Sequence, residues 1–272
     1  MNKQIRDKFP NWVNNNTEYS LCLSDDIDSF GGSIVLNKIK GYKITHFYTF
    51  NAIGTYKQVK KGNLIGVDID LTEGKTWGNH VTMLSKYDTY NKECANINVI
   101  NKISRENYYS KFCGSTLLQI LSYYNVDISN LTEEQLEILI CIDTGFKQYY
   151  FNKKIFIHYY KDVLEYPQFV DIVSKHNKQY FYNIIKKYKL HEKIHVKNGY
   201  LKTKIDLAGL SRVFSIPISL PTQKFNLITE FKTDAKSIKK SNYNVVKDKD
   251  IFSLAVTNRN FYVYSKIKKG GN

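Results

Sequence analysis

The sequence predicts an α/β fold in which a parallel sheet in the first part of the chain is followed by a smaller, basic α+β domain. Between residues 19 and 69, short apolar runs that end in acidic residues alternate with a helical pattern, which is typical of a parallel sheet. After residue 197 the apolar runs become short and strand-like. Residues 1–150 contain 16 basic and 16 acidic side chains, so the whole net charge of +15 lies in residues 151–272.

The elements of the first part follow from local patterns. Residues 29–39 place apolar side chains at helical spacing, and Gly41 closes that helix. The polar residues 51–62 predict a loop. Residues 114–124 predict an amphipathic helix, and Thr132 opens another through a capping box. Three apolar or aromatic runs predict buried strands: residues 19–23, 43–50 and 64–69.

These patterns divide the chain into three expected segments. Residues 1–150 form the sheet domain, residues 151–195 an aromatic, basic and helical connector, and residues 196–272 the basic second domain. In the last segment four runs indicate strands: residues 207–218, 225–231, 251–256 and 261–267. The turn-forming residues 257–260 join the last two runs.

Composition excludes several classes of protein. No run of 18 apolar residues is present, so we expect no membrane span, and the polar N-terminus lacks the apolar stretch of a secretory signal. The four cysteines are widely spaced, which excludes a zinc knuckle and favours a reducing, cytoplasmic setting. Cys22 and Cys141 lie in apolar runs and are expected in the core.

Acidic residues follow the expected strands, where ligands of parallel sheets bind. Asp26 and Asp28 come directly after the first strand, and two carboxylates at this spacing can face one hard cation. Asp68 and Asp70 follow the third strand, where burying an unpaired charge would be costly. The alternative for the first pair is an acidic helix start, which the helix dipole favours.

Two further positions complete the set of candidates. His80 follows Gly78 in a polar stretch, either as a metal ligand or as an ordinary surface histidine. Asp143 ends the apolar run 138–142, where Gly145 could also cap an ordinary helix. A helix C-terminus is an unfavourable place for an acid unless a cation is near, which favours the metal interpretation of Asp143.

In sequence order, these pieces resemble the DHH phosphoesterases. LCLSDDIDSFGGSIVL is similar to the family's first motif, LIGVDID to its second, and ILICIDTGF, the most specific match, to its fourth. The resemblance covers residues 19–150. In the family, acids and histidines bind two Mn²⁺ ions, which activate a water for attack on a phosphate. The resemblance implies bound Mn²⁺ (or Mg²⁺) and this ligand set: Asp26, Asp28, Asp68, His80 and Asp143.

The third motif departs from the family. Gly78-Asn79-His80 stands where Asp-His-His is expected, so Asp70 and His80 become the candidates for the missing catalytic groups. The glycine-rich substrate motif of the family is absent from the second half. Arg212 and Arg259 are the only arginines after residue 105, and we expect them to hold substrate phosphates, because arginine binds phosphate bidentately.

The resemblance predicts a hydrolase of phosphate ester bonds in a nucleotide or short single-stranded nucleic acid. One alternative is a degenerate DHH-like fold that binds nucleic acid or a protein partner without catalysis. Another is a HAD-like phosphatase that uses Asp68 and Asp70 in a DxDxT pattern. The chain has no Walker glycine loop, no GxGxxG and no GxSxG, so other nucleotide-binding and hydrolase classes lack support. The sequence gives no sign of the oligomeric state.

Overall fold

The protein has an α/β fold built on one large mixed sheet. The computed structural model describes residues 1–60, 62–242 and 245–268. Within these residues nine strands are hydrogen-bonded in the order β10-β11-β9-β3-β2-β1-β4-β5-β6, and β7 pairs with β8 in a separate ribbon. The strands are β1 Ser20–Leu23, β2 Lys43–Thr49, β3 Ala52–Thr55, β4 Leu64–Val67, β5 Thr76–Trp77, β6 Cys94–Ala95, β7 Ile194–Lys197, β8 Tyr200–Thr203, β9 Asn226–Ser237, β10 Ile251–Asn258 and β11 Phe261–Ile267.

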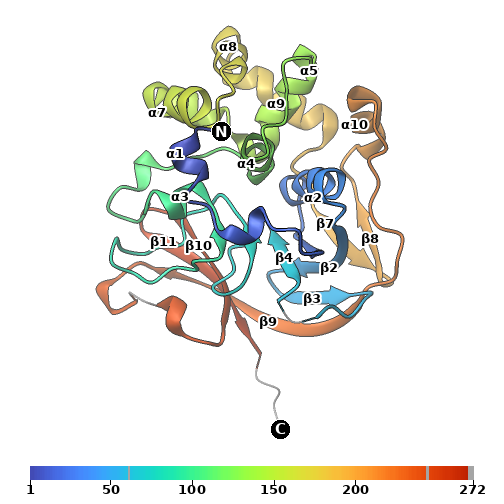
Figure 1. Ribbon diagram of the computed structural model, residues 1–272, viewed down its shortest axis with the longest axis vertical. Coiled ribbons are helices and arrows are strands. Elements are labelled where there is room, and N and C mark those ends of the chain that lie inside the picture. Colours follow the sequence, from blue (N-terminus) through green and yellow to red (C-terminus); the bar gives the residue numbers. More distant parts are fainter. Residues whose placement is uncertain (61, 243–244, 269–272) are drawn as a thin grey trace.

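The helices gather mainly at one end of the molecule, with β9 and the β10–β11 hairpin at the other end (Figure 1). Residues 151–195 are largely helical, as predicted. The α-helices are α1 Lys3–Arg6, α2 Ile27–Lys40, α3 Ile97–Ile100, α4 Thr116–Tyr123, α5 Glu133–Cys141, α6 Lys147–Phe151, α7 Lys153–Ile157, α8 Gln168–Lys175, α9 Lys178–Tyr188 and α10 Leu207–Phe214.

The half of the sheet from β2 to β6 is parallel, which confirms the predicted parallel sheet for this part of the chain. β1 pairs in parallel with β2 on one side and with β4 on the other. β5 and β6 continue in the same direction. The three strands predicted in the first 70 residues are confirmed with bounds that differ by at most two residues. Because these strands are parallel, their carboxyl ends share one edge of the sheet.

Short-range signals set the helix ends in this half. α2 begins after Asp26, whose Oδ1 accepts the N–H of Ser29 at 3.1 Å. It ends at Gly41, which has a left-handed backbone (φ 73°) that glycine adopts without strain. The capping box of Thr132 and Gln135 at the start of α5 is present as predicted.

Two predictions of secondary structure are wrong. The expected loop at residues 51–62 contains β3, which buries Ile53 and Thr55 on alternate positions and pairs with β2 and β9. Residues 207–218 form α10 followed by irregular chain, not a strand. There Leu207, Leu210 and Phe214 follow helical spacing and pack on the main core, and packing of that face favours the helix.

The strands of the second half extend the sheet of the first half. β9 pairs antiparallel with β3 and with β11, and the predicted turn at residues 257–260 joins β10 to β11. β10 then returns to the parallel half through bridges from Ser253 to Leu71 and from Val256 to Val81. One core cluster runs from Met1 to Phe225. The segment bounds at residues 150 and 195 stay a prediction.

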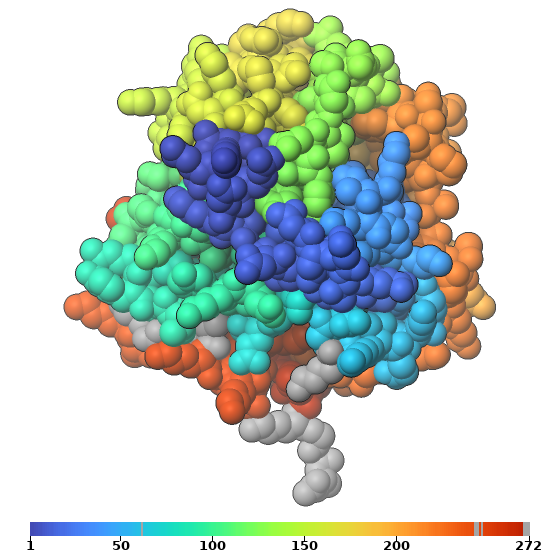
Figure 2. Space-filling view, viewed as in Figure 1, coloured from blue at the N-terminus to red at the C-terminus, as the bar shows by residue number. Residues whose placement is uncertain are grey.

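The N-terminal segment packs across the helices and the sheet. Figure 2 shows this segment, in dark blue, on the face between the helices and the strands. The amino group of Met1 donates to the carbonyl of Ser122 at 3.0 Å, and Phe9 contacts the rings of Trp77 and Tyr123. Within the described residues, no helix is long and apolar enough to cross a membrane. Cys22 and Cys141 are buried, which confirms the prediction for both.

Candidate functional site

Acidic and polar side chains gather at the carboxyl edge of β1, β4 and β5. Asp28 lies in the first turn of α2, and Asp68 follows β4 directly. Asn79 and His80 follow β5, and Asp143 lies just beyond α5. Asp68 and Asp143 both have a left-handed backbone (φ 55°), which non-glycine residues adopt at a cost and which is concentrated at functional sites.

Three cavities meet at this edge, and Asp143 lines all of them. The largest, of about 710 Å³, also borders Asp70, Asn79 and His80, and we call it the cleft. The second, of about 260 Å³, runs past Asp68 toward the start of α2. The third, of about 190 Å³, reaches the first turn of α2. The residues predicted to be metal ligands therefore surround one connected space.

Hydrogen bonds fix several of these carboxylates. The two oxygens of Asp28 accept the N–H groups of Thr116 and Leu117, each at 2.8 Å, so Asp28 caps the N-terminus of α4. The hydroxyl of Thr116 donates to Asp68 Oδ1 at 2.7 Å. The amide nitrogen of Asn79 donates to Asp143 Oδ2 at 2.5 Å. The acids are thus held at the edge by the first residues of α4 and by Asn79, which follows β5.

Other polar atoms at the edge have no partner. Asp70 Oδ1 and Asn79 Oδ1 are buried and accept no hydrogen bond within the described residues. Asp70 Oδ2 lies 3.0 Å from His80 Nδ1, which leaves the other ring nitrogen of His80 unconstrained by this contact. Buried oxygens without donors are costly, and a cation is one way to satisfy them.

The environment at this edge of the sheet disfavours the charged form of its carboxylates. Desolvation, and after it the charges of Asp68 and Asp143, raise the pKa of Asp28 well above its ordinary value. Desolvation and Asp26 likewise raise the pKa of Asp68 well above its usual range. Asp143 is exposed toward the cleft, yet desolvation outweighs the opposing charge of His80 and raises its pKa. The edge therefore favours a bound positive charge.

The same carboxylates also shift the pKa of His80. Desolvation alone would lower its pKa, but Asp70, followed by Asp68 and Asp143, raises it well above the ordinary value. Without a cation at the edge, the ring therefore carries a proton near neutral pH.

One built-in cation already contacts part of the site. Lys193 Nζ lies 3.0 Å from Asp25 Oδ1 and 3.2 Å from Asp26 Oδ2. Burial would lower the pKa of Lys193, but Asp26 and Asp25 raise it, so the ammonium stays charged. Asp26, predicted as a metal ligand, is thus occupied by Lys193 and by the N–H of Ser29. Nothing in the sequence distinguishes Lys193 from the many other lysines of this half.

The predicted site residues fall into three groups. All five predicted metal ligands and Asp70 line the connected cavities. Arg259 lies in the β10–β11 turn, 5.7 Å from the ring centre of Tyr109, which lines the cleft. Arg212 lies on α10 and lines none of these three cavities.

The predicted ligands surround a space without converging tightly on one point. In the described residues, only one group of three His, Cys, Asp or Glu side chains has all its ligand atoms within 4.8 Å of one another, and that group lies elsewhere. The reason is visible in the contacts: Asp28 turns to the N-terminus of α4, and Asp26 turns to Lys193. A search of known protein families, of curated proteins and of solved structures returned no match to this chain.

Proposed function

We propose that this protein is a metal-dependent phosphoesterase that hydrolyses phosphate ester bonds of a nucleotide or a short oligonucleotide. The observation that carries the proposal is the group of mutually repelling acids beside unpartnered oxygens at the carboxyl edge of a parallel sheet. Asp28, Asp68 and Asp143 raise one another's pKa or share a common repelling neighbour, so a divalent cation would relieve the largest unfavourable charge in the site.

The donor set fits Mn²⁺ or Mg²⁺. Asp68 and Asp143 offer carboxylate oxygens, and Asp70 Oδ1 and Asn79 Oδ1 are buried oxygens without a hydrogen-bond partner among the described residues. Hard cations of this kind prefer oxygen ligands. A bound cation would supply Lewis acidity toward a phosphate oxygen and neutralise its charge.

The chain's own residues would orient and neutralise the rest of the substrate. His80, held by Asp70 at 3.0 Å, can donate a proton to a leaving oxygen at the mouth of the site. Lys111 and Lys147 line the cleft and can meet further phosphates. Lys193 stands at the opposite end of the connected cavities, beside Asp26.

The cleft also has surfaces for a base. The rings of Tyr109 and Phe151 lie 5.7 Å apart at its wall and are 54% and 69% exposed. Exposed aromatic rings next to phosphate-binding lysines are the usual means of stacking a nucleobase. The aromatic residues of α9 do not line the cleft: Phe181 and Tyr188 are buried, while Tyr180 and Tyr182 are exposed elsewhere on the surface.

A substrate panel tests the proposal. Bis(p-nitrophenyl) phosphate, p-nitrophenyl phosphate, a mononucleotide and a set of dinucleotides and short oligonucleotides are incubated with Mn²⁺, with Mg²⁺ and with EDTA. We expect hydrolysis of at least one class that requires the metal and stops with EDTA. No hydrolysis of any phosphate ester, or hydrolysis that persists in EDTA, would contradict the proposal.

The length of the substrate can be read from salt dependence. If the basic second half tracks a nucleic-acid backbone, affinity should fall with salt at a log–log slope of about −0.7 per phosphate contacted. Binding of single-stranded oligomers of increasing length to the inactive Asp143→Asn variant, at two salt concentrations, measures that slope. We expect affinity to grow beyond two nucleotides. Affinity that stops growing at two nucleotides, with a shallow slope, would exclude the oligonucleotide and leave a small nucleotide as substrate.

A non-catalytic binder is the second candidate, and one observation favours it. Asp26 is engaged by Lys193, and Asn79 stands where the resembling family has an acidic or histidine ligand. A non-catalytic binder would bind the single-stranded oligomers of the binding series but would cleave none of them under saturating Mn²⁺. The panel and the binding series together separate the two candidates.

A further inference from the structure

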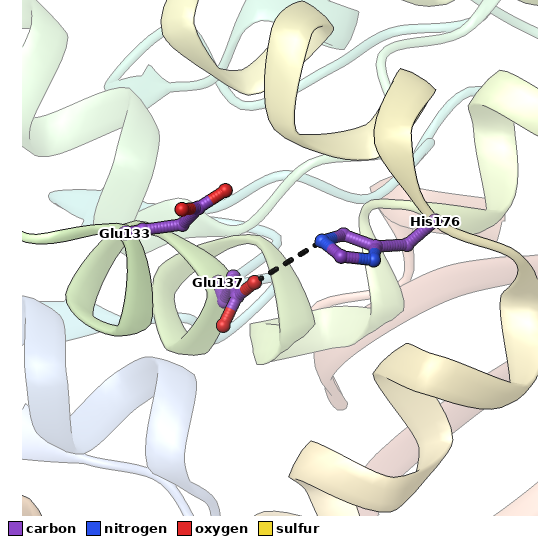
Figure 3. Close-up of side chains that lie close together, drawn as sticks. All are labelled: Glu133, Glu137 and His176. Atoms are coloured by element: carbon purple, nitrogen blue, oxygen red, sulfur yellow. Dashed lines mark ion pairs between the residues drawn. The ribbon is translucent and has the colours of Figure 1, made fainter.

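A second group of side chains with metal-binding chemistry lies away from the cleft. Glu133 and Glu137 stand one turn apart on α5, and His176 follows α8 (Figure 3). Each of these three side chains offers one ligand atom, and the three atoms lie within 4.8 Å of one another. Among the described residues, no other group of three His, Cys, Asp or Glu side chains meets this condition. None of the three lines the cavities of the candidate active site.

The histidine is aimed at a buried carboxylate. Glu137 is 5% exposed and accepts the hydroxyl of Tyr180 at 2.7 Å. The Nε2 of His176 lies 3.5 Å from Glu137 Oε1, is itself buried, and has no hydrogen-bond partner in the part of the chain that the structure describes. The His176 ring stacks on the Tyr180 ring with centres 3.7 Å apart and planes 5° apart, so its direction is fixed.

The separation of these atoms suits a metal better than a hydrogen bond. Good N–H···O hydrogen bonds span roughly 2.7–3.2 Å, and 3.5 Å is too long for one. Around a tetrahedral zinc ion with bonds of about 2.1 Å, neighbouring ligand atoms are about 3.4 Å apart. The distance from His176 Nε2 to Glu137 Oε1 therefore matches one edge of such a site.

The third ligand is available at the surface. Glu133 is exposed, and its Oε1 pairs with Lys175 Nζ at 2.8 Å. An exposed ion pair of this kind contributes little free energy, so a divalent ion can displace Lys175 and draw Glu133 inward. One imidazole and two carboxylates form a donor set that zinc accepts, with its fourth position open to water.

We propose that Glu133, Glu137 and His176 bind a divalent transition metal of the zinc class and tie α5 to the connection between α8 and α9. The site is independent of the phosphoesterase proposal, because it shares no residue with the acidic edge. It would stabilise the helical end of the molecule through a contact between segments about 40 residues apart in the sequence.

The test is a titration of the whole chain with zinc chloride by isothermal calorimetry, together with the melting temperature with and without zinc. His176→Ala and Glu137→Gln are the test variants. His158→Ala is the matched control, because His158 also faces a carboxylate, Asp162, at 3.3 Å, but both side chains are exposed. Zinc that binds at the acidic edge contributes equally to all four proteins.

We expect the wild type and His158→Ala to bind one more zinc equivalent than His176→Ala and Glu137→Gln, or to bind it at least about 100-fold more tightly. Zinc should raise the melting temperature more in the first pair than in the second. The Gln variant keeps an acceptor for Tyr180, so it decides the result if His176→Ala does not fold. Equal stoichiometry, affinity and thermal shift in all folded variants would overturn the proposal.

Discussion

Asp143→Asn should abolish metal-dependent hydrolysis, lowering kcat/KM by about 100-fold or more, while the protein stays folded. Loss of groups that merely support metal ligands already costs about 10–100-fold, and a direct ligand should cost at least as much. Asparagine keeps an oxygen that can accept the hydrogen bond from Asn79, so the substitution removes the charge and leaves the local contact in place. The measurement is kcat/KM with Mn²⁺, together with the Mn²⁺ affinity by calorimetry.

The matched control for this prediction is Asp127→Asn. Asp127 is exposed, lies in the loop between α4 and α5, and lines none of the three cavities. This variant should keep the activity and Mn²⁺ affinity of the wild type. If Asp143→Asn retains wild-type turnover and Mn²⁺ affinity, Asp143 holds no cation and the proposed function loses its central residue.

The parallel half of the fold can be predicted from the sequence because its signals are local. Buried strands with apolar runs, a capping box at Thr132 and a left-handed glycine at Gly41 each act within a few residues. The sequence does not reveal β3, because its residues Ala52–Thr55 lack the continuous apolar run that marks β1 and β4, and its second pairing partner β9 lies more than 170 residues away. α10 was misread because its packing face follows from tertiary contacts with the core.

The acids of the site can also be identified from local signals, since each follows a recognisable strand or helix. The contacts that each acid makes cannot be predicted from the sequence. Asp28 caps a helix 88 residues away, and Lys193 reaches Asp26 from 167 residues away. Such partners depend on the tertiary fold, and a lysine among 40 basic residues has no local signal. Thr116, which contacts Asp68, does have a local signal in the sequence, because it is the first residue of α4 and directly follows the N-cap Ser115.

Residues of the second half line the space at the acidic edge. β10 runs back to the acidic edge, where Ala255 lines both the cleft and the second cavity, and Lys193 precedes β7 at the other side. The strands of the second half therefore complete the walls of a space whose floor is acidic. Of the second-half residues that line the three cavities, only Lys193 is a lysine or arginine, and the other lysines there, Lys111 and Lys147, come from the first half. Acids beside a few lysines are the arrangement that a cation and a phosphate-bearing ligand would need together.

Stability of the metal-free protein should fall as the pH rises from about 5 to 8. A carboxyl whose folded-state pKa is raised binds its proton more tightly in the folded than in the unfolded chain. Asp28, Asp68 and Asp143 are of this kind, so each opposes folding as the pH rises from its unfolded pKa through its folded pKa. His80 acts in the same direction, because its raised pKa gives stability that is lost as the pH passes that pKa.

The expected slope is large enough to measure. A buried group such as Asp28 that is protonated only in the folded state costs up to about 1.4 kcal/mol per pH unit, or roughly 2–4 °C in melting temperature for each kcal/mol in a chain of this size. Asp143 is exposed, so screening by solvent makes its share smaller than this limit. His46 opposes the trend, since burial lowers its pKa, but it is one group and is unchanged in the comparison below. Asp143→Asn should melt at a higher temperature than the wild type at pH 8 and show a shallower slope.

Melting temperatures of the metal-free wild type and Asp143→Asn, measured at half-unit steps from pH 5 to 8 in EDTA, decide the matter. Saturating Mn²⁺ should flatten the wild-type curve, because a bound cation replaces the protons that the acids otherwise share. Saturating Mn²⁺ should change the melting curve of Asp143→Asn much less. A wild-type melting temperature that rises with pH, or that Mn²⁺ leaves unchanged throughout, would show that the acids at this edge do not repel one another enough to require a cation.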